Sequence, residues 1–186
     1  MKRLFDLSFS AILGVLLALP IGVIALLVKL TSSGPALYWS DRVGCGNRIF
    51  RMPKFRSMRV DTPAVATHLL GDPDTYLTPI GLALRKSSLD ELPQLWSILK
   101  GDMSFVGPRP ALFNQADLIE FRTQYGVHKL IPGLTGWAQV NGRDALKILE
   151  KVMMDVEYLQ RQSFGFDMKI LWMTLLKVIR SEGIAH

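Results

Sequence analysis

The longest apolar segment of the chain lies near its N-terminus, where no charged residue occurs between Phe9 and Val28. At about 1.5 Å per residue, a helix over this segment is about 30 Å long, which is enough to cross the hydrocarbon core of a bilayer. Pro20 lies in the middle of the segment. Because proline lacks an N–H and clashes with the carbonyl four residues earlier, it kinks or breaks a helix. The pattern predicts a membrane helix over residues 1–30 that is broken at Pro20.

Three interpretations of this element compete. Basic residues flank both ends, Lys2 and Arg3 before it and Lys29 after it. Since basic flanks stay on the cytoplasmic face, we expect a re-entrant hairpin that enters and leaves the membrane by that face. A single membrane span is the main alternative. A signal peptide fits the basic start, but the apolar run is too long and lacks a clear small-x-small cleavage site.

The remainder, residues 31–186, alternates short strand patterns with helical patterns. Leu37–Trp39 and Ile49–Met58 are predicted strands joined by a glycine-containing loop, and Pro53 restricts the second to a sheet edge. Helices are predicted at Pro63–Leu70, Leu82–Lys86, Leu92–Lys100 (with Leu92, Leu95, Trp96 and Leu99 on one face), Ala111–Tyr125, Ala145–Gln162 and Phe166–Ser181. With no linker dividing it, this part is predicted to form one domain, in which the candidate active site is expected. The predicted fold class is α+β, mainly helical: a re-entrant membrane helix, a short β-hairpin and amphipathic interfacial helices around the active site.

The last predicted helix combines a basic edge with a wide apolar face. Lys169, Lys177 and Arg180 follow one side, and Trp172 lies on the apolar face. A basic edge, an apolar face and a tryptophan are typical of a helix that lies in a membrane interface. A core helix with a solvated basic edge is the alternative.

Net charge and cysteine content narrow the classes of partner. The chain has 22 basic and 16 acidic residues, so its net charge of +6 favours a nucleic acid, an anionic membrane or a phosphorylated substrate. Cys45 is the only cysteine, which excludes an internal disulfide and a zinc site of the usual Cys/His spacing. The three histidines have no motif context and are expected to be structural or surface residues: His68, His128 and His186.

Adjacent carboxylates, Asp90 and Glu91, are the strongest candidates for chemistry. Ser88 and Glu91 match the S-x-x-E capping box, so a purely structural role is one interpretation. Pro93 makes a regular helix from Ser88 unfavourable, and we expect either an irregular first turn or a helix that begins at Leu92 or Pro93. Both arrangements place the carboxylates at the positive end of a helix dipole, which keeps them ionised and attracts phosphate.

Cations on both sides of this pair suit a phosphate ester. Arg85 precedes it, and Arg109 follows between Pro108 and Pro110, which restrict the backbone. Both arginines are expected to clamp phosphate oxygens. Mg²⁺, held by one or two carboxylates and the substrate phosphates, would neutralise the charge of a nucleotide diphosphate. Gly107 would allow a ligand to approach the main chain.

A second glycine-rich segment, Pro132–Arg143, offers groups that recognise a nucleobase or a sugar. It carries the ring of Trp137, the side-chain amides of Gln139 and Asn141, and the cation of Arg143. Taken alone it is a weak pattern, because glycine-rich loops with a buried tryptophan are common. A structural loop is therefore the alternative.

Four motifs resemble those of one protein family over nearly the whole chain. They are KFRSM at Lys54–Met58, RKSSLDELPQLW at Arg85–Trp96, KGDMSFVGPRP at Lys100–Pro110 and PGLTGWAQVNGR at Pro132–Arg143. In this order they resemble the monotopic polyprenyl-phosphate phosphoglycosyl transferases, the bacterial sugar transferase family, in its small catalytic-core form.

The resemblance implies roles for individual residues. It implies that Asp90 is the nucleophile, that Glu91 is a Mg²⁺ ligand and that Arg85 and Arg109 bind phosphate. Asp155 matches an acidic position near the family's site, and Lys54 belongs to a matching motif. Both are expected to bind the substrate or its phosphates. The family's helix break is often Ser-Pro, whereas this chain has Leu19-Pro20, so a hydroxyl that would serve the broken backbone is missing.

The resemblance also implies the reaction and its location. A phosphosugar passes from a UDP-sugar to polyprenyl phosphate, expected to be undecaprenyl phosphate, through a covalent aspartyl phosphosugar with release of UMP. The enzyme would act at the cytoplasmic face of the bacterial inner membrane, with membrane lipids and no nucleic acid as partners. One rival is a basic domain anchored by a single span that binds anionic lipid or nucleic acid without catalysis. Another is a phosphotransferase with a soluble acceptor. Neither the sugar nor the oligomeric state follows from the sequence.

Overall fold

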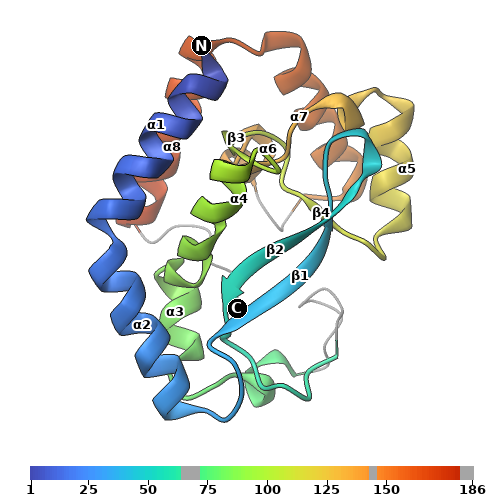
Figure 1. Ribbon diagram of the computed structural model, residues 1–186. Coiled ribbons are helices and arrows are strands. Elements are labelled where there is room, and N and C mark those ends of the chain that lie inside the picture. The colour runs from blue at the N-terminus through green and yellow to red at the C-terminus, as the bar shows by residue number, and fades with distance from the viewer. Residues whose placement is uncertain (64–71, 143–145, 181–186) are drawn as a thin grey trace.

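A computed structural model describes residues 1–63, 72–142 and 146–180. Helices α1 (Lys2–Leu16) and α2 (Ala18–Thr31) form a bent pair along one side of the molecule (Figure 1), with 63° between them. The predicted break is present, but it lies at Leu17, and Pro20 follows in the first turn of α2. A proline is tolerated in a first turn, because the N–H groups there have no partner within the helix. In the part of the chain described, no single helix has the length and apolar composition to cross a bilayer. The bent pair meets both criteria together.

Both ends of this helix pair are tied to the body of the protein. Lys2 Nζ lies 2.6 Å from Asp167 Oδ2, and Arg3 Nη1 donates to the carbonyl of Ile98 over 2.6 Å. After α2, Arg56 donates from Nη2 to the carbonyl of Ser32 over 3.0 Å. The basic residues at the N-terminus therefore make intramolecular contacts as well as flanking the apolar segment.

One face of α1 and α2 packs on the body, and the opposite face is apolar and exposed. Asp6 and Ser10 of α1 are buried, and Asp6 Oδ1 accepts a hydrogen bond from the backbone N–H of Phe105 over 3.1 Å. Ile24 and Val28 of α2 are buried beside Phe55. The exposed apolar side chains follow the whole length of the pair: Leu4, Leu7, Phe9, Ile12, Val15, Leu16, Leu19, Val23, Leu26, Leu27 and Leu30.

The predicted hairpin is confirmed, and its first strand is longer than expected. Strands β1 (Leu37–Val43) and β2 (Ile49–Phe55) pair antiparallel around the 3-10 helix η1 (Cys45–Asn47). Strand β4 (Ala111–Leu112) adds to the other side of β1, so β2 is an edge strand, as Pro53 requires. The predicted helix Ala111–Tyr125 is wrong at its start, because Ala111 and Leu112 pair with β1.

A second, parallel pair of strands joins β3 (Ser104–Val106) to β5 (Gly133–Thr135). A Cβ at Gly107, directly after β3, would lie 2.4 Å from the carbonyl oxygen of Ile131. The chain itself therefore occupies the space at Gly107 that the sequence assigned to a ligand.

The other predicted helices that fall on described residues occur in the predicted order, and a helix at Trp137–Asn141 was not predicted. Pro93 is accommodated in a 3-10 helix, so the α-helix after it begins only at Leu95 and ends at Gly101 with φ 92°. On this helix the predicted apolar face is partly wrong, because Trp96 is exposed and Ile98 is buried. The predicted helix Pro63–Leu70 falls almost wholly on residues outside those described. The elements not yet named are η3 (Pro73–Tyr76), α3 (Gly81–Lys86), η4 (Leu89–Gln94), α4 (Leu95–Lys100), α5 (Ala116–Gln124), η5 (Val127–Lys129), α6 (Trp137–Asn141), α7 (Ile148–Arg161) and α8 (Phe164–Arg180).

Helices α4, α7 and α8 enclose the main core with β3. Ile98, Val106, Tyr158 and Ile170 are fully or nearly fully buried there. Figure 1 shows α8 beside α1, and the rings of Phe5 and Phe164 meet at 5.6 Å. The expectation of a mainly helical α+β fold is confirmed. Helix α8 has a buried apolar side, which includes Ile170, and an exposed apolar side with Trp172, Leu175 and Val178.

Candidate active site

Asp90 and Glu91 lie in the first turn of the 3-10 helix η4. The predicted capping box is wrong, because Ser88 adopts a left-handed conformation (φ 56°) and its side chain makes no cap hydrogen bond. The backbone N–H of Glu91 instead donates to the carbonyl of Ser88 over 3.2 Å. The side chain of Glu91 is thus available for contacts with other elements.

Glu91 receives two cations at one oxygen. Lys54 Nζ on β2 and Arg109 Nη2 both lie 2.8 Å from Glu91 Oε1. Burial by itself raises the pKa of this carboxyl, but the charges and hydrogen bonds of Arg109 and Lys54 outweigh it and hold the pKa well below its ordinary value. The prediction that the pair stays ionised therefore holds for Glu91.

The pKa of Asp90 is shifted in the opposite direction. Burial raises the pKa of Asp90 and the charge of Glu91 adds to this, although Lys54, Arg109 and Arg85 lower it. The side chain is largely removed from water, since Asp90 is 8% exposed. Desolvation is the largest of these effects, so the pKa of Asp90 lies above its ordinary value. Neighbouring carboxyl groups with opposite pKa shifts are typical of a catalytic site in which each has a different role.

A buried ion pair holds the main-chain carbonyl of Arg109. Arg122 of α5 donates from Nη1 to the carbonyl of Arg109 over 2.8 Å. The same guanidinium donates from Nε and Nη2 to Asp155 Oδ2 over 2.9 and 2.7 Å. Asp155 is only 1% exposed. The structure thus puts Asp155 close to the predicted site, as a partner of Arg122 beneath the Pro-Arg-Pro loop.

Arg42 is a site residue that the sequence analysis did not identify. It lies on β1, where its Nη1 donates to the carbonyl of Pro110 over 3.2 Å and its Nε donates to Ser40 Oγ over 2.9 Å. Its charge interacts with those of Arg109 and Glu91. What places Arg42 near the Pro-Arg-Pro loop is its pairing with Leu112. That pairing depends on β4, a strand that the sequence did not predict.

In the described part of this segment, residues 132–142, the candidate side chains contact other groups of the protein. Gln139 Nε2 donates to the carbonyl of Leu134 over 2.9 Å, and Asn141 Nδ2 donates to that of Trp137 over 2.8 Å. The indole N–H of Trp137 donates to Glu157 over 2.7 Å, and Arg161 lies over its ring at 5.6 Å. Asn141 and Trp137 thus have partners within the protein that favour the structural interpretation of this segment. Gln139 is satisfied only in part, because its buried Oε1 has no hydrogen-bond partner among the described residues. Arg143 lies outside the described residues.

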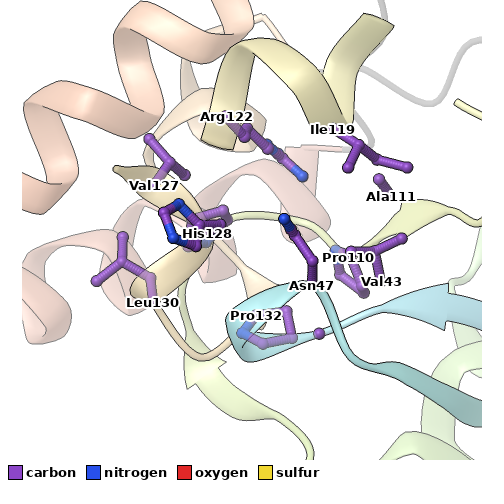
Figure 2. Close-up of a pocket in the computed structure, with 12 residues that line it drawn as sticks. Val43, Asn47, Pro110, Ala111, Ile119, Arg122, Val127, His128, Leu130 and Pro132 are labelled. Atoms are coloured by element: carbon purple, nitrogen blue, oxygen red, sulfur yellow. The ribbon is translucent and has the colours of Figure 1, made fainter. Parts of the chain in front are cut away.

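A small cavity lies behind the Pro-Arg-Pro loop (Figure 2). Its volume is about 30 Å³, and Pro108, Pro110, Arg122 and His128 are among the residues that line it. This is room for about one water molecule, too little for a nucleotide or a sugar. Among described atoms, the buried Nδ1 of His128 has no hydrogen-bond partner. The cavity is therefore not the substrate site, and the structural or surface role of His128 stays a prediction.

The carboxylate pair fits a magnesium ion that arrives with a substrate. Among the residues described, no group of three or more metal-binding side chains occurs. Mg²⁺ commonly binds through one or two carboxylates and completes its shell with water and substrate phosphates. Lys54 and Arg109 both contact Oε1 of Glu91, and these two bonds do not use Oε2. Asp90 and Glu91 supply the hard oxygen ligands that such an ion prefers.

Comparison with known proteins identifies the family of this chain. The family model described as bacterial sugar transferase matches residues 1–181. The uncharacterized sugar transferase EpsL of Bacillus subtilis is 41% identical over 99% of this chain and 90% of its own length. The UDP-glucose:undecaprenyl-phosphate glucose-1-phosphate transferases of Caulobacter vibrioides and Escherichia coli are 38% and 39% identical over 98% and 95% of this chain. This chain covers 71% of the length of the Caulobacter protein and 40% of the length of the Escherichia coli protein. It covers 36% of the length of the undecaprenyl-phosphate glucose phosphotransferase of Komagataeibacter xylinus. The match over almost the whole chain, in agreement with its four motifs, means that the protein belongs to the bacterial sugar transferase family.

Proposed function

We propose that this chain transfers a sugar phosphate from a UDP-sugar to a polyprenyl phosphate and so begins the synthesis of a bacterial glycoconjugate. The observation that carries the proposal is the adjacent pair Asp90 and Glu91, with opposite pKa shifts, among the cations of Lys54, Arg109 and Arg85. Relatives with 38% and 39% identity are named UDP-glucose:undecaprenyl-phosphate glucose-1-phosphate transferases. A site with two carboxylates and several cations suits a diphosphate bound with a divalent ion.

Asp90 is the proposed nucleophile. A carboxylate oxygen of Asp90 forms a bond to the sugar-bearing phosphorus, and the bond from that phosphorus to the bridging oxygen breaks. UMP leaves with the bonding electrons. Burial of Asp90 also removes water from its oxygen atoms, so the ionised group attacks with less solvent to displace.

The second step restores Asp90. An oxygen of the polyprenyl phosphate bonds to the same phosphorus, and the bond to Asp90 breaks. The product is a polyprenyl diphosphate sugar. Because both nucleophiles are anionic oxygens, neither step needs a general base, and no histidine is assigned a catalytic role.

Glu91, Arg109 and Arg85 bind and orient the diphosphate. Glu91 would hold Mg²⁺, which neutralises the phosphate charge when bound. Arg109 donates from Nη2 to Glu91, and its main-chain carbonyl accepts a hydrogen bond from Arg122. Such positioning contributes to the rate because the guanidinium need not reorganise as charge develops.

The geometry of α1 and α2 supports a re-entrant membrane helix. The start of α1 is tied to Ile98 and Asp167, and the chain after α2 is tied to Arg56. Both ends of the pair thus contact the body that carries Asp90, whereas a single span would separate them by a bilayer. With the exposed apolar residues of α8, the outer face of the pair would bring the active site to a lipid acceptor at the cytoplasmic face of the inner membrane.

Release of UMP in the presence of both substrates tests the proposal. The purified protein in lipid nanodiscs is incubated with a panel of UDP-sugars, with and without undecaprenyl phosphate. We expect UMP release with at least one UDP-sugar, at a rate that requires the lipid. UMP release that continues over many turnovers without the lipid, with a slow hydrolysis control subtracted, would indicate a soluble acceptor. No release with any member of the panel would contradict the proposed reaction.

A further inference from the structure

Arg42 is a partly buried cation that has no carboxylate partner among the described residues. Arg109 pairs with Glu91 and Arg122 pairs with Asp155, each at 2.7–2.8 Å. Arg42 takes part in none of the ion pairs that the described residues form. Its hydrogen bonds go to two neutral oxygens, the carbonyl of Pro110 and the hydroxyl of Ser40.

The electrostatics of this position favour an additional anion. Burial and the charge of Arg109 lower the pKa of Arg42 to about 10, and the attraction of Glu91 offsets only part of this. The guanidinium remains ionised at neutral pH. Removing a charge from water costs free energy unless an opposite charge compensates it. Binding of an anionic ligand beside Arg42 would provide that opposite charge.

Arg42 lies beside the Pro-Arg-Pro loop. It bonds the carbonyl of Pro110, the residue directly after Arg109. Arg122 bonds the carbonyl of Arg109 itself, so two guanidinium groups hold successive carbonyls of the Pro-Arg-Pro loop. A guanidinium has five N–H groups, and the two hydrogen bonds to described residues leave three of them for another acceptor.

We propose that Arg42 binds a phosphoryl oxygen of a substrate beside Arg109, and that the substrate supplies the anion that Arg42 lacks. The inference rests on the proposed transfer of a sugar phosphate, and adds a residue to its phosphate-binding set. Two substrates of that reaction carry phosphoryl oxygens, the UDP-sugar and the polyprenyl phosphate. The measurements below distinguish them.

Direct binding of inorganic pyrophosphate tests the anion site without turnover. Pyrophosphate and, separately, UMP are titrated calorimetrically into the full chain in nanodiscs, as wild type, Arg42→Gln, Arg42→Lys and Arg51→Gln. Arg51 is the matched control, because it lies exposed on the same hairpin and stacks on Trp39 at 5.5 Å. We expect Arg42→Gln to weaken pyrophosphate binding about 10- to 100-fold and Arg42→Lys to weaken it less, since lysine keeps the charge and loses the bidentate geometry. Arg51→Gln is expected to bind within about twofold of wild type.

Steady-state kinetics assign the phosphoryl group. A rise in KM for the UDP-sugar identifies the donor diphosphate as the ligand, and a rise in KM for the polyprenyl phosphate identifies the acceptor. Wild-type pyrophosphate affinity and wild-type KM values in Arg42→Gln, with only a lower kcat or melting temperature, would overturn the inference and leave Arg42 as a support of the loop. If Arg42→Gln does not fold, wild-type affinity in Arg42→Lys would overturn it equally. A wild-type protein that turns over no UDP-sugar contradicts the proposed function, whereas the pyrophosphate titration still decides the role of Arg42.

Discussion

Arg122 donates from Nη1 to the main-chain carbonyl of Arg109 over 2.8 Å. Because Arg122 is itself ion-paired with the buried Asp155, this one hydrogen bond connects a charge pair in the interior with the side chain that contacts Glu91. A change at Asp155 is thus expected to reach the active site through the backbone of the Pro-Arg-Pro loop, without any contact between Asp155 and a substrate.

Removal of one member of this pair should destabilise the protein. Asp155→Asn leaves Arg122 buried without its counterion, and we expect a loss of about 3–5 kcal/mol in the free energy of unfolding, measured by denaturant titration. The matched control is Asp61→Asn. Asp61 belongs to an exposed pair with Arg59, so the expected change is within about 0.5 kcal/mol.

Replacing both members separates stability from activity. The double variant Arg122→Met, Asp155→Leu removes the buried charges together, and we expect its stability to return to within about 1–2 kcal/mol of wild type. The carbonyl of Arg109 still lacks its donor, so kcat/KM should remain at least about tenfold below wild type. Full activity in a stable double variant would show that Arg122 does not position Arg109.

Asp90→Asn tests the covalent step. Asparagine keeps the shape of the side chain and cannot form the acyl phosphate, so we expect turnover to fall about 10³-fold or more. The readout is retention of label from a UDP-sugar labelled in the sugar-bearing phosphate, followed by intact mass. Label bound to the Asp90→Asn protein would contradict the nucleophile, and Asp61→Asn, with its exposed carboxylate, serves as the control that should still be labelled.

Removal of divalent metal tests the role proposed for Glu91. We expect EDTA to abolish UMP release by the wild type and added Mg²⁺ to restore it. Glu91→Gln should require a higher Mg²⁺ concentration for half-maximal rate and should lower kcat about 10²-fold, because a carboxamide is a poorer ligand for a hard cation. Activity that is unaffected by EDTA would exclude the ion from the mechanism.

The topology of α1 and α2 can be measured with the single cysteine. Cys45 is exposed, so a membrane-impermeant maleimide reports its side of the membrane, and a tag at Met1 reports the N-terminus. In a re-entrant arrangement both react only in inside-out vesicles. Labelling of the tag and of Cys45 from opposite sides would favour the single span and contradict a cytoplasmic site reached by a hairpin.

The exposed face of the helix pair should control membrane association. Val15 and Leu19 are 78% and 77% exposed, so lysine at either position adds charge to that face without disturbing the core. We expect Val15→Lys and Leu19→Lys each to reduce co-sedimentation with lipid vesicles several-fold at unchanged melting temperature. The corresponding control is Glu120→Lys, which changes charge on α5 and should not reduce co-sedimentation.

The sequence by itself determined the features that depend on neighbouring residues. An uncharged segment with a central proline predicted a broken helix, since proline acts on the turn before it. Alternating residues around a glycine loop predicted the hairpin, and Pro53 predicted its exposed edge. Long motifs in a fixed order predicted the family and the pair Asp90 and Glu91.

Only the tertiary structure decided which groups meet. Lys54 and Arg109 reach Glu91 from 37 and 18 positions away, and Arg42 reaches Pro110 from 68. The left-handed Ser88 removed a capping box that the local pattern favoured. Burial raised the pKa of Asp90, whereas the cations of Arg109 and Lys54 lowered the pKa of Glu91. Periodicity and turn chemistry act over a few residues, whereas packing fixes burial and the distances between charges, and these set the electrostatics of the site.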